Sequence, residues 1–250
     1  MIRNLQVDMK RLFLNRRFYY CVVGMAVALL VSGIAYVHNC SGITTLEECY
    51  DQATGGGFVI LFYMLCVVGG GLDYCMDVKN HYMRYMVIRN GVRPYAVSKT
   101  ITSVISGYVS MFLGQIMYCG MMFVYLMIQN KSVSGILSGG KDFEDMCWFI
   151  LVFALLGSVL SVVGLFVTAF IPNVFVGMAT PVLVYYVVII LSNRYCRNQY
   201  LMPSCIYFSY YQLFGSGGRH FLYALLVTIC FTVILYTGIY HQMKRRGEHV

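Results

Sequence analysis

The sequence predicts an all-α integral membrane protein with six transmembrane helices. Of its 250 residues, 59% are hydrophobic and only 11% are charged, whereas a soluble domain carries roughly 25% charged residues. So few charged side chains cannot cover the surface of a soluble fold of this size. Apolar stretches of about 20 residues, the length that crosses a bilayer, recur along the chain. No polar stretch is long enough to form a soluble catalytic domain.

The first 17 residues, MIRNLQVDMKRLFLNRR, predict an amphipathic helix that lies in the membrane interface. Its apolar side chains share one helical face, and most of its basic side chains fall off that face. The apolar residues are Ile2, Leu5, Met9, Leu12 and Phe13. A solvated basic tail that only sets the membrane topology is the alternative.

Residues 18–250 are predicted to form one transmembrane domain of six spans. The second span is short and ends in glycines, and Pro172 separates the fourth span from the fifth. The first span is too long for the apolar region of a signal peptide and no cleavage site closes it, so it is expected to be retained. The spans are Phe18–Val37, Phe58–Leu72, Ile101–Ile128, Met146–Phe170, Val174–Leu191 and Phe221–Tyr240. The polar, acidic segment His38–Gly57 is expected outside the membrane.

The distribution of basic residues predicts that both termini face the cytoplasm. With that orientation, only five of the 18 lysines and arginines lie in outer segments, as the positive-inside rule requires. These five are Lys131, Lys141, Arg194, Arg197 and Arg219. The net charge of +8 is therefore explained by the membrane topology. The sequence has no basic stripe with interleaved aromatic residues, which would indicate nucleic-acid binding.

The predicted spans contain no Asp, Glu, Lys, Arg or His. Ion-coupled carriers, proton relays and intramembrane proteases need ionisable groups within the membrane, because they bind or transfer charge there. The sequence therefore argues against these three classes. Energy for transport would have to come from a cytoplasmic partner.

A long basic loop, residues 73–99, is expected to follow the second span. It carries an aromatic and methionine-rich stretch beside two arginines, which suits docking into a groove on a soluble protein. These residues are Tyr82, Met83, Arg84, Tyr85, Met86 and Arg89. An interfacial helix whose aromatic rings lie at headgroup depth is the alternative.

The whole chain resembles the permease subunit of the ABC-2 family of ATP-binding-cassette exporters. The matching features are the basic amphipathic N-terminal helix, six spans of this spacing and a long loop containing MRYMVIRNGVRPYAVSK. The break IPNVFVGM between spans four and five and a polar, aromatic hairpin before span six also match. The architecture carries this resemblance more than any single motif.

The resemblance implies the transmembrane subunit of an ATP-driven exporter in a bacterial cytoplasmic membrane. Its cargo would be amphipathic or hydrophobic: a peptide of the bacteriocin or phenol-soluble-modulin type first, then a drug or lipid. ATP and magnesium would bind a separate ATPase subunit, because this chain has no G-x-x-x-x-G-K-[ST] loop. The chain itself is then not an enzyme and carries no cofactor. A non-transporting membrane scaffold or assembly factor is the alternative function.

The resemblance also assigns roles to particular residues. A coupling helix at about His81–Asn90 would bind the ATPase, with Arg84, Tyr85, Met86 and Arg89 as the coupling residues. The outer hairpin, residues 193–218, would be re-entrant and close the exit; an exposed loop is the alternative. Two copies of the permease, most simply a homodimer, would form the working unit with the ATPase.

Because the predicted spans contain no charged side chains, we expect cargo to pass between two copies of the chain. Spans one, two and five are the candidates for that seam, although each of the following residues could simply pack between helices. The possible lining residues are Tyr36, Phe62, Tyr185 and Tyr186. Small residues in span four indicate close helix packing within the chain or a dimer seam. They are Ala154, Gly157, Ser158, Ser161, Gly164 and Thr168.

Two pairs of cysteines lie in the predicted outer segments, where disulfides can persist. They are Cys40 with Cys49 and Cys196 with Cys205, and eight residues separate the members of each pair. Two disulfides are therefore expected, with four free thiols as the alternative.

Overall fold

The computed structural model describes residues 2–39, 45–129, 140–195, 198, 200, 202–207 and 215–248. These residues form helices joined by short turns, and no strand occurs among them. Five helices are long and apolar enough to cross a membrane, and a bent pair of shorter helices makes up to six. The prediction of an all-helical fold with several potential membrane spans is confirmed.

The five long helices extend the predicted spans at their ends. They are α2 (Arg16–Asn39), α7 (Val92–Ile128), α9 (Gly140–Phe170), α10 (Val174–Tyr195) and α12 (Gly217–Glu248). The shorter helices are α1 (Ile2–Leu14), α3 (Leu46–Gly55), α4 (Val59–Gly70), α5 (Asp73–Lys79), α6 (Tyr82–Asn90) and α11 (Pro203–Tyr207). The break at Pro172 is confirmed: α9 ends before it, and the side chain of Asn173 accepts a 3.0 Å hydrogen bond from the N–H of Phe175 to begin α10.

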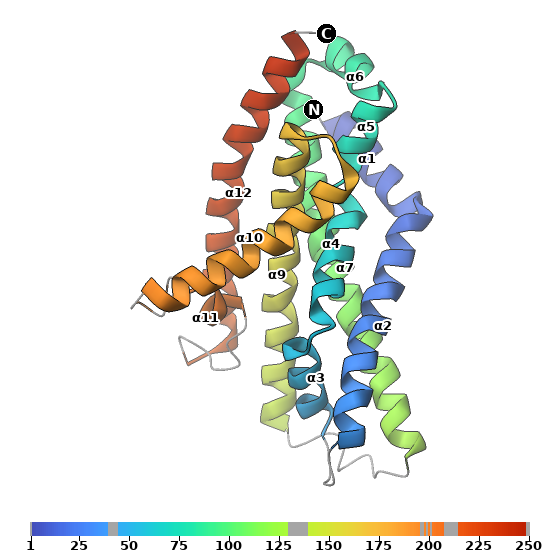
Figure 1. The fold of residues 1–250 in the computed structure, drawn as a ribbon, viewed down its shortest axis with the longest axis vertical. Coiled ribbons are helices and arrows are strands. Elements are labelled where there is room, and N and C mark those ends of the chain that lie inside the picture. Colours follow the sequence, from blue (N-terminus) through green and yellow to red (C-terminus); the bar gives the residue numbers. More distant parts are fainter. Residues whose placement is uncertain are drawn as a thin grey trace.

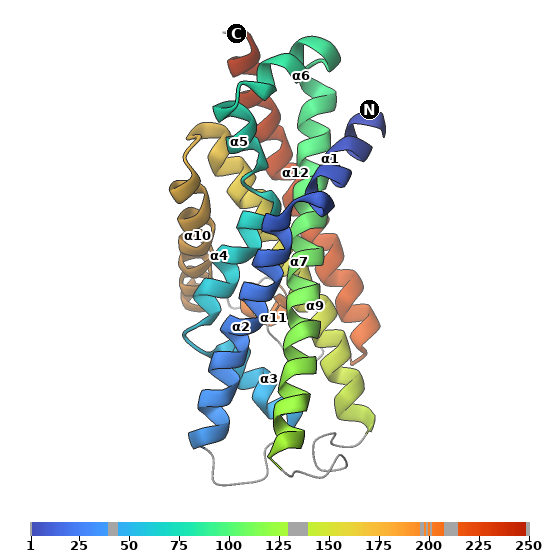
Figure 2. The ribbon, with the colours of Figure 1, turned by 90° about the vertical axis from the view of Figure 1, so that its right-hand side faces the viewer.

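Most of the long helices run along the long axis of the molecule, and α10 crosses the bundle obliquely (Figure 1). The two termini, α1, α5 and α6 gather at one end of the bundle in both views (Figures 1 and 2). When the bent pair α3 and α4 is counted as one crossing there are six crossings, and this even number places both termini at the same end; that this end faces the cytoplasm stays a prediction. At this end Arg246 donates a 2.7 Å hydrogen bond to the carbonyl of Phe170 and so caps α9.

The region of the second predicted span differs from the prediction, because α4 is joined to α3 in a bent pair of helices. The two helices bend by 79° at a break of a few residues, Gly56 to Phe58. At 1.5 Å per residue, α4 alone is about 18 Å long, short of the roughly 30 Å hydrocarbon core. The segment that was expected outside the membrane therefore contains a helix that packs in the bundle.

The pattern of α3 explains both its fold and the wrong expectation. Thr45 and Glu48 form a reciprocal capping box that begins the helix. Its buried residues recur at helical spacing and face α2 and α7, whereas its acidic side chains lie on the other face. The buried residues are Leu46, Cys49, Tyr50, Ala53 and Thr54. The polarity of the segment reflects one face of an amphipathic helix.

Helix α9 is the centre of the bundle, and its small residues face α7 and α4. A Cβ atom on Gly107 of α7 would lie 2.3 Å from the carbonyl oxygen of Gly157, so the two backbones are in direct contact. The hydroxyls of Ser103 and Ser161 lie 2.9 Å apart at the same crossing. The close packing expected of span four thus occurs within one chain.

Candidate functional site

Helix α6 lies at the extreme end of the bundle, beside the C-terminal end of α12 (Figure 1). It has two distinct faces. His81, Arg84, Tyr85 and Ile88 recur at helical spacing and are exposed, as is Arg89. Met83 and Met86 lie on the opposite face and are buried. We call the exposed set, His81, Arg84, Tyr85, Ile88 and Arg89, the α6 face.

The expectation that Met86 belongs to a docking surface is wrong, because only 6% of its surface is exposed. It packs in a second hydrophobic cluster that joins α5, α6, α7, α9 and α12. The other members of this cluster are Tyr74, Met83, Tyr95, Ala96, Val162, Leu165, Ala169, Ile239 and Met243. Ile88, which is 78% exposed, takes its place on the α6 face. The helical spacing of residues 81, 84, 85 and 88 was the signal that could have identified it.

A buried charge network lies at the same end of the bundle, and Asp77 of α5 is its centre. The carboxylate of Asp77 lies 2.8 Å from the ammonium of Lys99 and 2.9 Å from the guanidinium of Arg11. It also accepts a 3.0 Å hydrogen bond from the hydroxyl of Tyr95. Lys99 makes a second ion pair, 3.2 Å from Asp8, and Ser98 donates to the same carboxylate.

The network corrects two sequence expectations. Residues 73–99 are not one loop, since they form α5, α6 and the first turns of α7. Lys99 therefore lies within the helix of the third span, and its side chain is 2% exposed. Among residues 5–14 of α1, those that are buried are Asp8 and Leu12. The face of α1 that meets the bundle thus carries a charge, whereas the sequence suggested an apolar face.

The network joins three separate helices, and its charges on Asp8, Asp77 and Lys99 are buried, whereas the Arg11 side chain is 47% exposed. Buried ions destabilise a fold unless they are paired and hydrogen-bonded, and here Asp8, Asp77 and Lys99 each have an opposite charge in contact. Arg11 extends the connection to α6, because its guanidinium lies 5.1 Å from the ring centre of Tyr82. Helices α1, α5, α6 and α7 are therefore held as one unit.

Asp73, in the first turn of α5, makes stability depend on pH. Burial raises its pKa from 3.8 to about 6; Asp77 and Asp8 add to this and Lys99 and Arg11 oppose it. The folded state therefore binds this proton more tightly than the unfolded chain does. The free energy of unfolding should rise as the pH falls through 6 towards 4, by about 2 kcal/mol.

Thermal unfolding measured between pH 8 and pH 5 tests this prediction. We expect the wild-type chain to unfold at higher temperature at pH 5 than at pH 8, and Asp73→Asn to remove most of that difference. Asp51→Asn is the control, because Asp51 is exposed on α3 and its replacement should leave the pH profile unchanged. An unchanged profile in Asp73→Asn would refute the assignment.

The four candidates for a cargo path lie in or beside the main core. Phe62 is fully buried and stacks on Phe153, with ring centres 6.0 Å apart. Tyr185 is 7% exposed and lies 5.2 Å from the ring of Tyr63. Tyr36 and Tyr186 are partly exposed and pack against the same core. Phe62 thus meets other side chains of this chain, and only Tyr36 and Tyr186 keep substantial surface.

The predicted disulfides remain predictions. Cys40 and Cys196 lie outside the described residues. Cys49 is buried on α3, and Cys205 is partly buried on α11. Among the described residues, no group of three or more His, Cys, Asp or Glu side chains is arranged to hold a metal ion.

A comparison with protein-family models, curated proteins and solved structures finds no match.

Proposed function

We propose that this chain is the transmembrane subunit of an ATP-driven exporter, and that a separate ATPase binds the α6 face. The observation that carries the proposal is the two-sided character of α6. A short helix at the end of a membrane bundle exposes an isoleucine, a tyrosine and two arginines, and its other side is buried among the spans. Aromatic, aliphatic and arginine side chains are those that anchor protein interfaces.

The packing beneath α6 supports a coupling role. Met83 and Met86 belong to the second hydrophobic cluster, which also contains residues of α7, α9 and α12. Tyr82 contacts Arg11, which is paired with Asp77 of the charge network. A displacement of α6 by a bound ATPase would therefore be transmitted to the spans through packed side chains and ion pairs.

The remaining parts of the proposal follow from the resemblance and the positive-inside rule. The end that carries α6 faces the cytoplasm of a bacterial cell, and the working unit contains two copies of the chain and two ATPases. The hairpin before the last span is re-entrant. In support, α11 lies part-way along the bundle (Figures 1 and 2), and the carbonyl of Ile206 is 2.9 Å from Nε2 of the buried His220 on α12. The cargo is amphipathic or hydrophobic, with a peptide favoured.

Affinity purification from the native membrane tests the central claim. An ATPase with a G-x-x-x-x-G-K-[ST] loop should co-purify with the tagged chain. The double variant Tyr85→Ala/Ile88→Ala should weaken this association by about 2 kcal/mol, roughly thirtyfold in Kd, as removal of interface anchors does. The control is Phe175→Ala on α10, which is also strongly exposed but lies off α6.

Two outcomes would contradict the proposal. Recovery of the folded chain without any ATPase would favour the scaffold or assembly factor. Equal ATPase recovery by the double variant and by Phe175→Ala would exclude the α6 face. Met86→Ala serves as a third comparison, because loss of a buried side chain should lower thermal stability without removing an exposed contact.

A further inference from the structure

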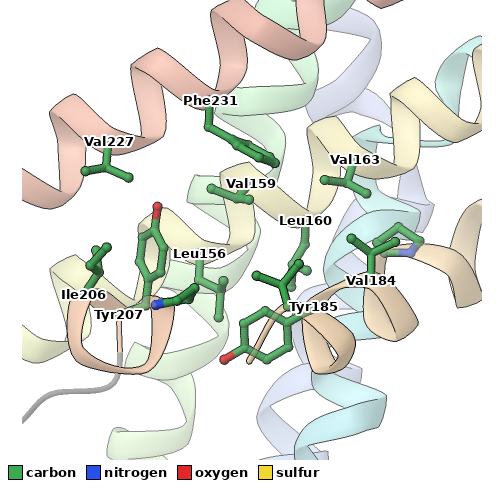
Figure 3. A pocket seen from close by; sticks show the side chains of 13 residues that line it. Leu156, Val159, Leu160, Val163, Val184, Tyr185, Ile206, Tyr207, Val227 and Phe231 are labelled. Atoms are coloured by element: carbon green, nitrogen blue, oxygen red, sulfur yellow. The ribbon is translucent and has the colours of Figure 1, made fainter. Parts of the chain in front are cut away.

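A cavity of about 170 Å³ lies between α9, α10, α11 and α12. Figure 3 shows that the labelled side chains of all four helices converge on it. The residues that line it are Leu156, Val159, Leu160, Val163, Pro181, Val184, Tyr185, Val188, Pro203, Ile206, Tyr207, Val227 and Phe231. None of them is Asp, Glu, His, Lys or Arg, and most are aliphatic.

The polar side-chain groups in the wall of this cavity are the hydroxyls of Tyr185 and Tyr207. The hydroxyl of Tyr207 lies 2.9 Å from that of Thr228, which in turn donates a 2.8 Å hydrogen bond to the carbonyl of Ala224. A cavity with such a wall does not hold water, which requires two or more polar partners. Its natural occupant is apolar.

The cavity opens sideways, between α10 and α12. These two helices pack on α9 and not closely on each other. Val184, Val188 and Phe231 form the rim, and each is more than a third exposed. The neighbouring exposed side chains of the two helices are also apolar, among them Leu183, Val187, Leu226 and Val233. The mouth therefore lies in a surface that faces the hydrocarbon chains of the bilayer.

We propose that an acyl chain of a membrane phospholipid enters between α10 and α12 and occupies this cavity. An apolar cavity of about 150 Å³ is large enough to bind benzene, so this one accepts a segment of several methylenes. Methylenes inside the cavity make packing contacts with its wall that an empty cavity forfeits, and the lipid-facing rim lets the rest of the chain stay in the bilayer. The site needs only this chain, so it does not depend on the proposed function.

Photolabelling tests the site, and the buried helix α9 makes the readout specific. The purified protein is placed in nanodiscs that contain a phosphatidylcholine with a diazirine in the middle of one acyl chain, and labelled peptides are mapped by mass spectrometry. Leu156 and Leu160 are each 1% exposed, so ordinary surface lipid cannot reach them. A chain inside the cavity should label Leu156 and Leu160 on α9.

Two pairs of variants separate cavity occupancy from surface contact. Val227→Phe on α12 and Val184→Phe on α10 fill the cavity or its mouth, so the chain would overlap the added ring and α9 labelling should fall roughly tenfold. Val233→Phe and Val187→Phe make the same change at exposed positions of the same helices that do not line the cavity, and should leave α9 labelling unchanged. Labelling of exposed α10 residues should persist in all four variants.

The proposal fails if the wild-type protein shows no label on α9, or if both filling variants retain it. If one filling variant does not fold, as judged by gel filtration, the other decides the outcome. A free fatty acid that carries the same diazirine is compared in parallel. Preferential labelling of α9 by the free acid over the phospholipid would also overturn the assignment to a membrane phospholipid.

Discussion

Replacing Lys99 by methionine should destabilise the protein by about 4 kcal/mol, the cost typical of breaking a buried ion pair. Methionine occupies a similar volume and is apolar, so packing is largely kept and the loss is electrostatic. Asp8 and Asp77 are each at most 3% exposed, and both would lose the ammonium that lies within 3.2 Å of them. The measurement is denaturant unfolding followed by the fluorescence of the single tryptophan, Trp148.

Two further variants distinguish the effect of losing the ion pairs of Lys99 from the effect of losing a lysine side chain. Lys79→Met is the control for losing one lysine, because Lys79 is exposed on α5, and it should change stability little. The triple variant Asp8→Asn/Asp77→Asn/Lys99→Met removes the opposing charges together and should recover most of the loss, since no unpaired ion is left buried. Failure of the triple variant to exceed Lys99→Met in stability would refute this electrostatic account.

Replacing Gly107 by alanine should destabilise the protein by about 3 kcal/mol, at the upper end of the range for overpacking a core. The added Cβ would lie 2.3 Å from the carbonyl oxygen of Gly157 and 2.8 Å from the Cβ of Ser161. Because the nearest atom belongs to the backbone of α9, no side-chain rotation relieves the clash and the two helices must separate. The same tryptophan-monitored unfolding measures the effect.

The same helix offers a matched control for this substitution. Gly120, also on α7, has no atom within 4 Å of the position that a Cβ would take. Gly120→Ala should therefore be neutral or stabilise the protein by up to about 1 kcal/mol, because alanine is the better helix former. Equal stabilities of the two alanine variants would mean that α7 and α9 are not in backbone contact.

The two predictions concern the same helix and explain why α7 organises the bundle. Its first turns carry Lys99, which joins α1 and α5, and its middle carries Gly107, which lies against α9. Buried ion pairs at one end of α7 and close backbone packing in its middle fix the register of α7 relative to its neighbours. The α6 face is positioned by the same helix, because Tyr95 and Ala96 of α7 share a cluster with Met83 and Met86.

The composition and the spacing of apolar stretches were enough to predict a helical membrane protein, the positions of the long helices and the break at Pro172. These features depend on local properties: a bilayer requires about 20 apolar residues in a row, and every backbone polar group must be satisfied within the segment. The common end of the two termini follows from the number of crossings. The small residues of span four indicated close packing for an equally local reason, since they allow two backbones to approach.

Contacts between distant residues decided the rest. The acidic helix α3 looked like an outer loop, because its polarity hides the buried face made by Leu46, Tyr50 and Ala53. Met86 and Ile88 are similar in size and hydrophobicity, and only the packing of α6 against the rest of the bundle buries the first and leaves the second exposed. Lys99 was counted as part of a basic loop, because its partners Asp8 and Asp77 lie 91 and 22 residues away. A charged side chain can be buried at low cost only where an opposite charge lies close to it in the folded structure. The spacing of residues along the sequence does not reveal that proximity.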